Sequence, residues 1–245
     1  MPRVQDLYGR FFTRFRETAQ TRLERALELL GAGASAQASA IQIELYSLAG
    51  EAAFLGCREV HALARQGETF ARQIPSDPKA VVACMRALRA LGRALETLEP
   101  PRDSEATDPA PAPAPAPARP EIRGRILLAD DSKLSADLLT TMFSEEGLVV
   151  EAVSNHVGLE RALATLRIDL ALSDVNMPEL DCATVCRRVR EVAPRAPVVL
   201  ISGLDEEALA RECQRVSADG YVPRERGLTA VVERVIAELA KRRRE

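Results

Sequence analysis

Three acidic side chains stand where strands of the second half of the chain are expected to end. Asp130 and Asp131 come directly after the apolar run 125–129. Asp174 comes directly after the run 170–173. Parallel strands that end at one edge of a sheet would bring these carboxylates together, and they would repel one another without a cation. Mg²⁺ is the expected metal, because it would let a phosphate approach and would neutralise charge on a phosphoryl group attacked by one carboxylate.

The elements that position these acids follow from a repeated pattern after residue 123. Short apolar runs alternate five times with helical patterns, which predicts βα units and a parallel sheet buried between helices. The expected fold is therefore α/β, a doubly wound, flavodoxin-like sheet of five strands with its active site outside the carboxyl ends of the strands. The expected strands are 125–129, 149–153, 170–173, 197–201 and 220–222, and the expected helices are 134–146, 158–166, 182–193, 206–214 and 228–240.

Polar residues at these strand ends stand in an order that resembles the response regulator receiver domain of two-component signalling. The matching segments are Asp130-Asp131-Ser132, Asp174-Val175-Asn176-Met177-Pro178, Ser202-Gly203 and Tyr221-Val222-Pro223-Arg224, and the resemblance covers about 123–242. It implies that Asp174 is the phosphorylated aspartate and that Ser202 and Arg224 act with it on the phosphoryl group. The implied Mg²⁺ ligands are Asp130, Asp131, Asp174 and the backbone carbonyl of Asn176.

The resemblance also implies a switch. Ser202 would hydrogen-bond the phosphoryl group and move with it, and Tyr221 would be the aromatic side chain whose rotamer follows. A local change of charge would in this way alter the surface that other proteins contact.

Two positions depart from the pattern of this family. Arg224 stands where the family carries a lysine, and Cys182 stands where a glycine usually follows the Met-Pro turn. Arg224 keeps the positive charge but replaces a compact ammonium by a planar fork, and Lys133 is misplaced to substitute for the lysine. Two interpretations therefore stay open, a phosphorylatable receiver domain and a pseudo-receiver that serves only for docking.

Residues before the linker show helical periodicity and almost no strand pattern. Apolar stripes cover 8–30, which ends near Gly31 and Gly33, 41–55, which Gly56 stops, 60–74, and 81–98, which follows Asp77 and Pro78. Four amphipathic helices with short connections predict an all-α, up-and-down four-helix bundle. Alternating prolines between Asp108 and Pro120 then predict a semi-rigid linker of roughly 40 Å. The expected domains are the bundle at 1–100, the linker at 101–122 and the receiver domain at 123–245.

Within the second predicted helix, the segment around Tyr46 resembles the motif of the histidine-phosphotransfer family. Tyr46 occupies the histidine position, Ala49 occupies the lysine position, and Gly50 is retained. Tyr46 lies off the apolar stripe, so it should project from the bundle, but a phenol ester is too stable for reversible phosphoryl transfer. The bundle is thus interpreted as a degenerate phosphotransfer module that docks on a receiver face, its own or a partner's. The alternatives are a bundle that only dimerises the chain and an unrelated four-helix domain.

Composition limits the remaining function classes. The formal net charge of −3 gives no general attraction to nucleic acid, and no apolar stretch is long enough to span a membrane, so a cytoplasmic protein is expected. The five cysteines form no metal motif and should stay reduced.

The leading hypothesis is a non-enzymatic signalling protein with no DNA-binding or catalytic output domain. It receives phosphate from a histidine kinase or phosphotransfer protein and contacts a downstream signalling protein. The rivals are a phosphorylation-independent scaffold and a phosphate sink.

Overall fold

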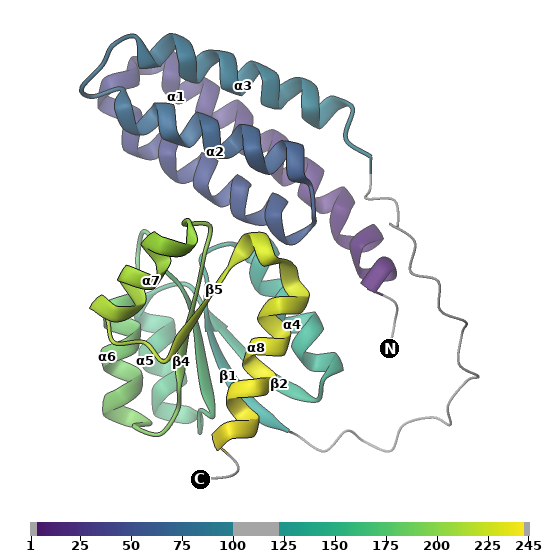
Figure 1. Cartoon of the computed structure of the whole chain (residues 1–245), viewed down its shortest axis with the longest axis vertical. Helices are drawn as coiled ribbons and strands as arrows, with labels where there is room; N and C mark the ends of the chain where they lie inside the picture. The colour runs from purple at the N-terminus through teal and green to yellow at the C-terminus, as the bar shows by residue number, and fades with distance from the viewer. Residues whose placement is uncertain (1–3, 100–122, 243–245) are drawn as a thin grey trace.

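The computed structural model describes residues 4–99 and 123–242, which form a helical bundle and an α/β half (Figure 1). The predicted proline-rich linker at 101–122 lies outside the described residues. Within the part of the chain that is described, no helix combines the length and the apolar character needed to cross a membrane.

The α/β half contains the predicted sheet of five parallel strands. Its strands are β1 (Gly124–Ala129), β2 (Leu148–Val153), β3 (Leu170–Asp174), β4 (Val198–Ser202) and β5 (Gly220–Pro223). They lie in the order β2-β1-β3-β4-β5, which is the doubly wound, flavodoxin-like order. The inner strands β3 and β4 are buried along their whole length, as expected for a parallel sheet covered on both faces.

Helices cover both faces of this sheet. They are α4 (Lys133–Glu145), α5 (His156–Thr165), α6 (Cys182–Val192), α7 (Glu206–Arg215) and α8 (Gly227–Arg242), with a short 3-10 helix η1 (Arg224–Arg226) between β5 and α8. Alternate strand residues point to opposite sides, so Leu128 packs with the side chains of α4 and α8, whereas Leu127 packs with those of α5, α6 and α7. The fold class predicted for this half is confirmed.

Short polar residues fix the starts of α4, α5, α6 and α7 at the carboxyl end of the sheet. Ser132, Asn155, Asp181 and Asp205 are the N-caps of α4 to α7, and each side chain accepts a hydrogen bond from a backbone N–H three residues later. These caps hold the strand-to-helix loops in place. These loops carry Asp130, Asp131 and Asn176, whereas Asp174 and Ser202 are the last residues of their strands.

The amino-terminal half is all helical, with α1 (Val4–Phe54), α2 (Arg58–Gln73) and α3 (Ala80–Glu96). The first helical stretch ends at Gly33, as predicted, but the second begins before residue 41, because helical backbone continues through the alanine-rich residues 34–40, where alanine favours a helix. Only Gly33 departs, with φ 140° and ψ 78°. Arg22 pairs with Glu44, yet 22 residues of straight helix would separate them by about 33 Å, so the chain reverses at Gly33. Four helical segments therefore pack together, as predicted.

The start of the last helix is also close to the prediction. The Asp77 side chain accepts a hydrogen bond from the backbone N–H of Lys79 at 2.9 Å, and the turn that it holds leads into α3 at Ala80. Pro78 lies inside this turn, where its missing N–H costs nothing.

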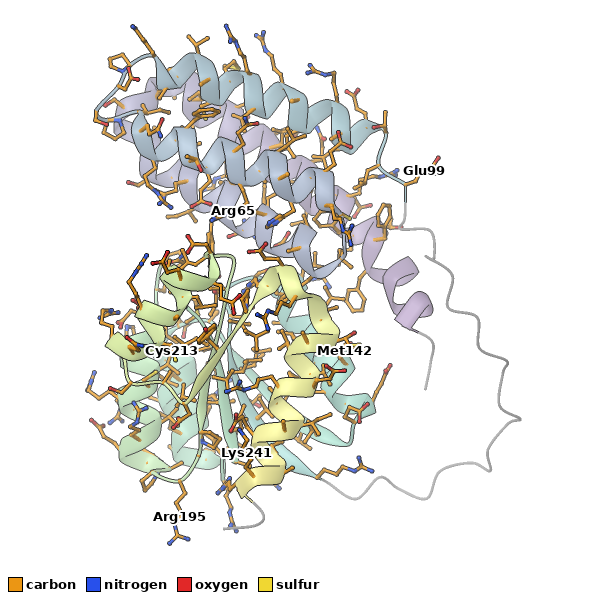
Figure 2. The ribbon with its side chains drawn as sticks, viewed as in Figure 1. Arg65, Glu99, Met142, Arg195, Cys213 and Lys241 are labelled. Atoms are coloured by element: carbon orange, nitrogen blue, oxygen red, sulfur yellow. The ribbon has the colours of Figure 1, made fainter. Side chains whose placement is uncertain are left out.

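The bundle lies against the carboxyl ends of the strands, where α1 packs on α4, η1 and α8 (Figure 1). Figure 2 shows the orientation clearly, because Arg195, which precedes β4, lies at the far end of the α/β half, whereas Arg65 of α2 lies beside the junction. One apolar cluster runs from the core of the bundle into the side of the sheet covered by α4 and α8. The two halves therefore share a continuous buried surface.

Replacing Gly33 by alanine tests the reversal of α1. A Cβ at φ 140° is strained, so Gly33→Ala should lower the free energy of unfolding by about 1–3 kcal/mol. Gly31→Ala is the matched control, because its Cβ would meet nothing within 4 Å and alanine favours a helix there, giving a gain of about 0.5–1 kcal/mol. Urea unfolding of the full chain measures both, and equal effects of the two substitutions would contradict the reversal.

Candidate functional site

Three carboxylates meet at the carboxyl ends of β1 and β3. Asp130 and Asp131 follow β1, and Asp174 is the last residue of β3, which pairs directly with β1. One carboxylate oxygen of each lies within 4.8 Å of the others. Asp130 and Asp174 are buried, with 3% and 2% of their surface exposed, and Asp131 is half-buried. The structure thus brings together the three acids that the sequence predicted to converge.

The negative charge of the three carboxylates is not fully balanced by nearby positive charge. Burial raises the pKa of Asp130 to about 7, and the Asp174 carboxylate adds to the rise. Burial and the same carboxylate raise the pKa of Asp131 to about 6. Hard carboxylate oxygens at this spacing are the donors that Mg²⁺ prefers, and a divalent cation would stabilise their charged forms. The residues present therefore fit a magnesium ion.

Arg224 supplies the one cation that contacts two of these acids in the described part of the chain. It is the first residue of η1, directly after β5, and only 2% of it is exposed. Its Nη2 lies 2.9 Å from Asp130 Oδ2 and 2.9 Å from Asp174 Oδ2. Burial alone would lower the pKa of Arg224, but the two carboxylates raise it above its ordinary value, so the guanidinium stays charged.

The planar fork of Arg224 explains how an arginine fits at this position. Nη2 bridges the two carboxylates, while Nη1 donates a hydrogen bond to Ser135 Oγ in α4 at 2.9 Å. A lysine ammonium has its three donors on one nitrogen, whereas the guanidinium reaches Ser135 with a second nitrogen while the first stays between the carboxylates. Arg224 is therefore part of the site.

Tyr46 enters the same site from the bundle. Its hydroxyl oxygen lies 2.7 Å from Ser202 Oγ. Its O–H donates a hydrogen bond to Asp174 Oδ1 at 3.3 Å. The backbone N–H of Gly203 donates a hydrogen bond back to the Tyr46 hydroxyl at 3.2 Å. Burial, followed by the negative charge of Asp174, raises the pKa of Tyr46, so the phenol keeps its proton. As the sequence predicted, Tyr46 projects from the bundle, and the receiver-like face that it reaches belongs to the same chain.

Two further bundle residues, Glu51 and Phe54, complete the contact. Glu51 is fully buried and accepts a hydrogen bond from Ser132 Oγ at 2.7 Å, while Arg22 holds the same carboxylate oxygen at 3.1 Å. The centroid of the Phe54 ring lies 4.8 Å from Cζ of Arg224, as in a cation–π contact. Glu51 carries a charge within the helical segment 41–55, but Glu44 in the same segment does too, so charge alone did not single out Glu51.

Gly50 lies between these contacts, at a close approach of α1 to Arg224. A Cβ at this position would stand 3.1 Å from Cδ of Arg224 and 3.3 Å from its Nη1. The neighbouring Ala49 is buried in the bundle, and its carbonyl accepts a hydrogen bond from Nδ1 of His61 at 2.9 Å. His61 is therefore tied to the bundle itself and makes no described hydrogen bond to the carboxylates.

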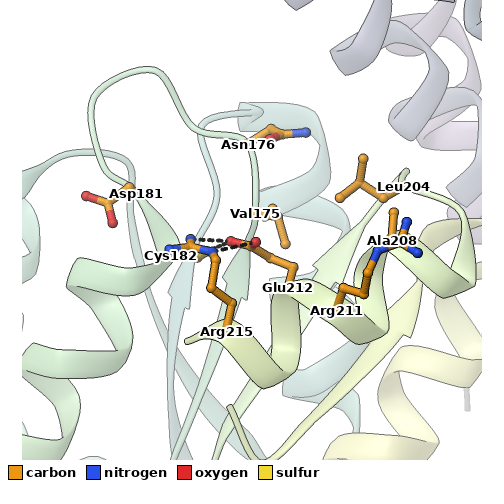
Figure 3. Close-up of a pocket in the computed structure, with 9 residues that line it drawn as sticks. All are labelled: Val175, Asn176, Asp181, Cys182, Leu204, Ala208, Arg211, Glu212 and Arg215. Carbon is orange, nitrogen blue, oxygen red and sulfur yellow. Dashed lines mark hydrogen bonds and ion pairs between the residues drawn. The ribbon is translucent and has the colours of Figure 1, made fainter. Parts of the chain in front are cut away.

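The other predicted site residues lie at the edge of this cluster. Asn176 is exposed in the loop after β3 and lines a cleft of about 500 Å³ beside the acids (Figure 3). In the same cleft the Cys182 thiol donates to Glu212, which also pairs with Arg215. Tyr221 is half-buried in β5 and packs with the cluster on the α5–α7 side. Among the described residues no hydrogen bond joins Tyr221 to the acids or to Ser202.

The cysteines take no part in the site as ligands. All five are free thiols and all are buried. Burial raises the pKa of Cys57, Cys84 and Cys186 to about 11, which keeps these thiols protonated and of low reactivity.

Comparison with known proteins places the resemblance in the α/β half. The family model for the response regulator receiver domain matches residues 126–236. The chemotaxis protein CheY of Treponema pallidum is 30% identical over 118 residues, which cover 47% of this chain and 82% of that protein. The sensor histidine kinase RcsC of Salmonella typhimurium is 32% identical over 139 residues, 57% of this chain. The aligned region is only 14% of the length of RcsC.

The signal receiver domain of a signal transduction histidine kinase from Syntrophus aciditrophicus aligns with a TM-score of 0.44 and 28% identity. The alignment covers 48% of this chain and 91% of that domain.

Removing the Arg224 side chain tests its role as the buried countercharge. Arg224→Ala leaves two buried carboxylates facing each other and should lower the free energy of unfolding by about 3–5 kcal/mol in metal-free buffer at pH 7. Added Mg²⁺ should recover part of the loss, because it replaces the missing positive charge. Arg226→Ala is the control on the same helix turn, since its pair with Glu206 is exposed and should change stability by less than about 0.5 kcal/mol. Urea unfolding that gave equal values for the two variants would contradict this role.

Proposed function

Because the chain belongs to the response regulator receiver family, we propose that residues 123–245 accept a phosphoryl group on Asp174 from a histidine kinase or a histidine-phosphotransfer protein. The change at Asp174 then alters contacts with a downstream signalling protein. In this proposal the chain is a signalling protein of the cytoplasm, with neither a catalytic output of its own nor nucleic acid as a partner. The proposed division of the chain is a bundle at 1–100, a linker at 101–122 and the receiver domain at 123–245.

The observation that carries the proposal is the arrangement around Asp174. Two further carboxylates, a buried guanidinium and a hydroxyl group surround it at the carboxyl edge of a parallel sheet. A nucleophile, a metal-binding acid pair and two groups able to hold phosphoryl oxygens are the parts that this transfer needs. The residues are Asp174, Asp130, Asp131, Arg224 and Ser202.

Magnesium is the proposed cofactor. Its proposed ligands are the carboxylates of Asp130, Asp131 and Asp174 and the backbone carbonyl of Asn176. When bound, the ion supplies positive charge that offsets the charge of the incoming phosphoryl group.

In the proposed step, a carboxylate oxygen of Asp174 forms a bond to phosphorus while the bond from phosphorus to the donor's imidazole nitrogen breaks. The nitrogen keeps the electron pair of the broken bond, and Asp174 becomes an acyl phosphate. The Arg224 guanidinium, already held beside Asp174, would stabilise a phosphoryl oxygen, and the Ser202 hydroxyl would donate a hydrogen bond to another.

The proposed switch links Ser202 to Tyr221. A Ser202 side chain that turns toward the phosphoryl group would leave space beside β4, and the half-buried Tyr221 of β5 would move inward. The surface formed by α7, β5 and α8 would change as a result.

For the bundle we propose a degenerate phosphotransfer module that serves in docking. Tyr46 and Ala49 take the places of the histidine and lysine of that family, and Gly50 keeps the close approach to a receiver face. The phenol of Tyr46 is not a relay group, because its phosphate ester would be too stable to pass phosphate on.

A phosphorylation-independent scaffold is the second candidate function, and one observation favours it. Arg224 and Tyr46 occupy the partners of Asp174 with side chains of the chain itself. A pair of folds locked together in this way would hold a shape without any phosphoryl group.

Incubation of the full chain with acetyl phosphate and Mg²⁺, followed by intact-mass measurement, tests the proposal. The wild type should gain one phosphoryl group, and chelation of Mg²⁺ or the substitution Asp174→Asn should abolish the gain. Asp205→Asn is the matched control, because asparagine caps a helix as well as aspartate and this position lies outside the acid cluster.

Three outcomes separate the candidate functions. An Asp174-dependent gain that persists supports the proposed function. No such gain favours the scaffold, and a gain that is rapidly lost by hydrolysis favours a phosphate sink. Arg224→Lys, compared for yield and lifetime of the acyl phosphate, shows whether the arginine tunes the site or disables it.

A further inference from the structure

The phosphoryl acceptor is covered by the chain's own bundle. Only 2% of the Asp174 surface is exposed, and the Tyr46 side chain that lies over it is itself 6% exposed. A kinase or phosphotransfer protein has to bring a phosphorus atom into bonding contact with an oxygen of Asp174. With the bundle docked, the ring and hydroxyl of Tyr46 occupy the space through which the phosphorus atom would have to approach Asp174.

The Tyr46 hydroxyl also uses the hydrogen bonds that a phosphoryl group would need. Ser202 Oγ lies 2.7 Å from it, and the Gly203 N–H donates to it at 3.2 Å. Its own oxygen lies 3.3 Å from Asp174 Oδ1, within the space that a phosphoryl group on that carboxylate would fill. A phosphoryl group on this side of Asp174 and a docked Tyr46 would therefore compete for the same partners and the same volume.

We propose that the bundle is an intramolecular gate, in which docked Tyr46 and the phosphorylation of Asp174 exclude each other. Phosphoryl transfer then requires the bundle to leave the receiver face, and phosphorylated Asp174 prevents it from returning. The gate rests on the proposed function, since it regulates access to the same aspartate.

The gate is formed by one face of α1, which contacts both Asp174 and Arg224. Tyr46, Gly50 and Phe54 recur at intervals of four, so they form a stripe along one side of the helix. Tyr46 meets Asp174, whereas Gly50 and Phe54 both meet Arg224. The stripe thus covers both the nucleophile and its countercharge.

Contacts outside this stripe hold the same position. Glu51 bonds the N-cap of α4, Ser132, and Arg14 of α1 pairs with Asp137 of α4 at 2.5 Å. The shared apolar cluster adds buried surface along α4 and α8. The closed arrangement is therefore built from several contacts, and loosening any one of them should raise the open fraction.

Mutual exclusion has a quantitative consequence. If only the open form accepts phosphate, the observed rate of phosphorylation equals the rate for the open form multiplied by the open fraction. By linkage, phosphorylation of Asp174 must then disfavour docking of the bundle by the same free energy by which docking disfavours the phosphorylated form.

Two variants open the gate without changing the receiver domain. Tyr46→Ala removes the side chain that covers Asp174. Gly50→Leu keeps Tyr46 but drives a side chain into Arg224, while leucine favours the helix and so preserves the bundle. The controls are Val82→Ala, on an exposed position of α3, and Gly31→Leu, where a Cβ meets nothing within 4 Å.

The first readout is the initial rate of phosphorylation of the full chain by acetyl phosphate with Mg²⁺. Tyr46→Ala and Gly50→Leu should both react at least about tenfold faster than the wild type. Both control variants should react at the wild-type rate. Tyr46→Phe, which loses the hydroxyl but keeps the ring, should fall between.

The second readout is the radius of gyration from small-angle X-ray scattering. Beryllium fluoride with Mg²⁺, a mimic of the phosphoryl group, should expand the wild type to the value of Tyr46→Ala. No expansion would overturn the gate.

The failures of the two proposals are distinguishable. If the wild type and both gate variants react at one rate, Asp174 is a phosphoryl acceptor but the gate is wrong. If neither gate variant nor the wild type gains a phosphoryl group, the proposed function fails and the gate fails with it.

Discussion

Burial of carboxylate charge at one edge of the sheet is the constraint on which the rest of the structure depends. Asp130 and Asp174 are almost fully removed from water, and the backbone fixes them close together because β1 and β3 are neighbours. Such a pair is unstable unless positive charge or hydrogen-bond donors reach it. Arg224 delivers the charge and Tyr46 a donor, so the ends of β5 and α1 are held by the same electrostatic requirement.

The bundle reaches the buried carboxylates through the small residue Gly50 as well as through its polar residues. Gly50 lets the backbone of α1 approach the arginine, and this approach brings Phe54 onto the guanidinium and Tyr46 onto the aspartate. Glu51 then satisfies Ser132, whose hydroxyl also caps α4. The docking face and the frame of the acidic site are consequently not separate, because the residue that starts α4 belongs to both.

Local patterns in the sequence were enough for the α/β half. Alternation of strand and helix periods located all five strands to within about a residue at most ends, and the acids converged because their positions follow from strand order alone. The bundle was harder. Its second helix begins earlier than its apolar stripe, since alanines extend a helix without marking a buried face.

The contact between the two halves lay beyond such reasoning. Tyr46 and Asp174 are 128 residues apart, and no period or cap reports on a pair so distant. The sequence indicated that Tyr46 projects from the bundle and that Gly50 is retained, but a receiver face of the same chain and one of a partner would fit these indications equally well. Glu51 looked like an ordinary member of an amphipathic helix, because Ser132, to which it is hydrogen-bonded, comes from the other half.

Contact between Arg224 and the α1 stripe couples the two halves through a single side chain. The guanidinium that holds Asp174 also lies beside the ring of Phe54, two turns of helix beyond Tyr46. A lysine at 224 would remove the planar partner of that ring, and a histidine at 46 would bring a titratable ring close to the same guanidinium. A substitution in either half is therefore expected to change the surroundings of a side chain in the other.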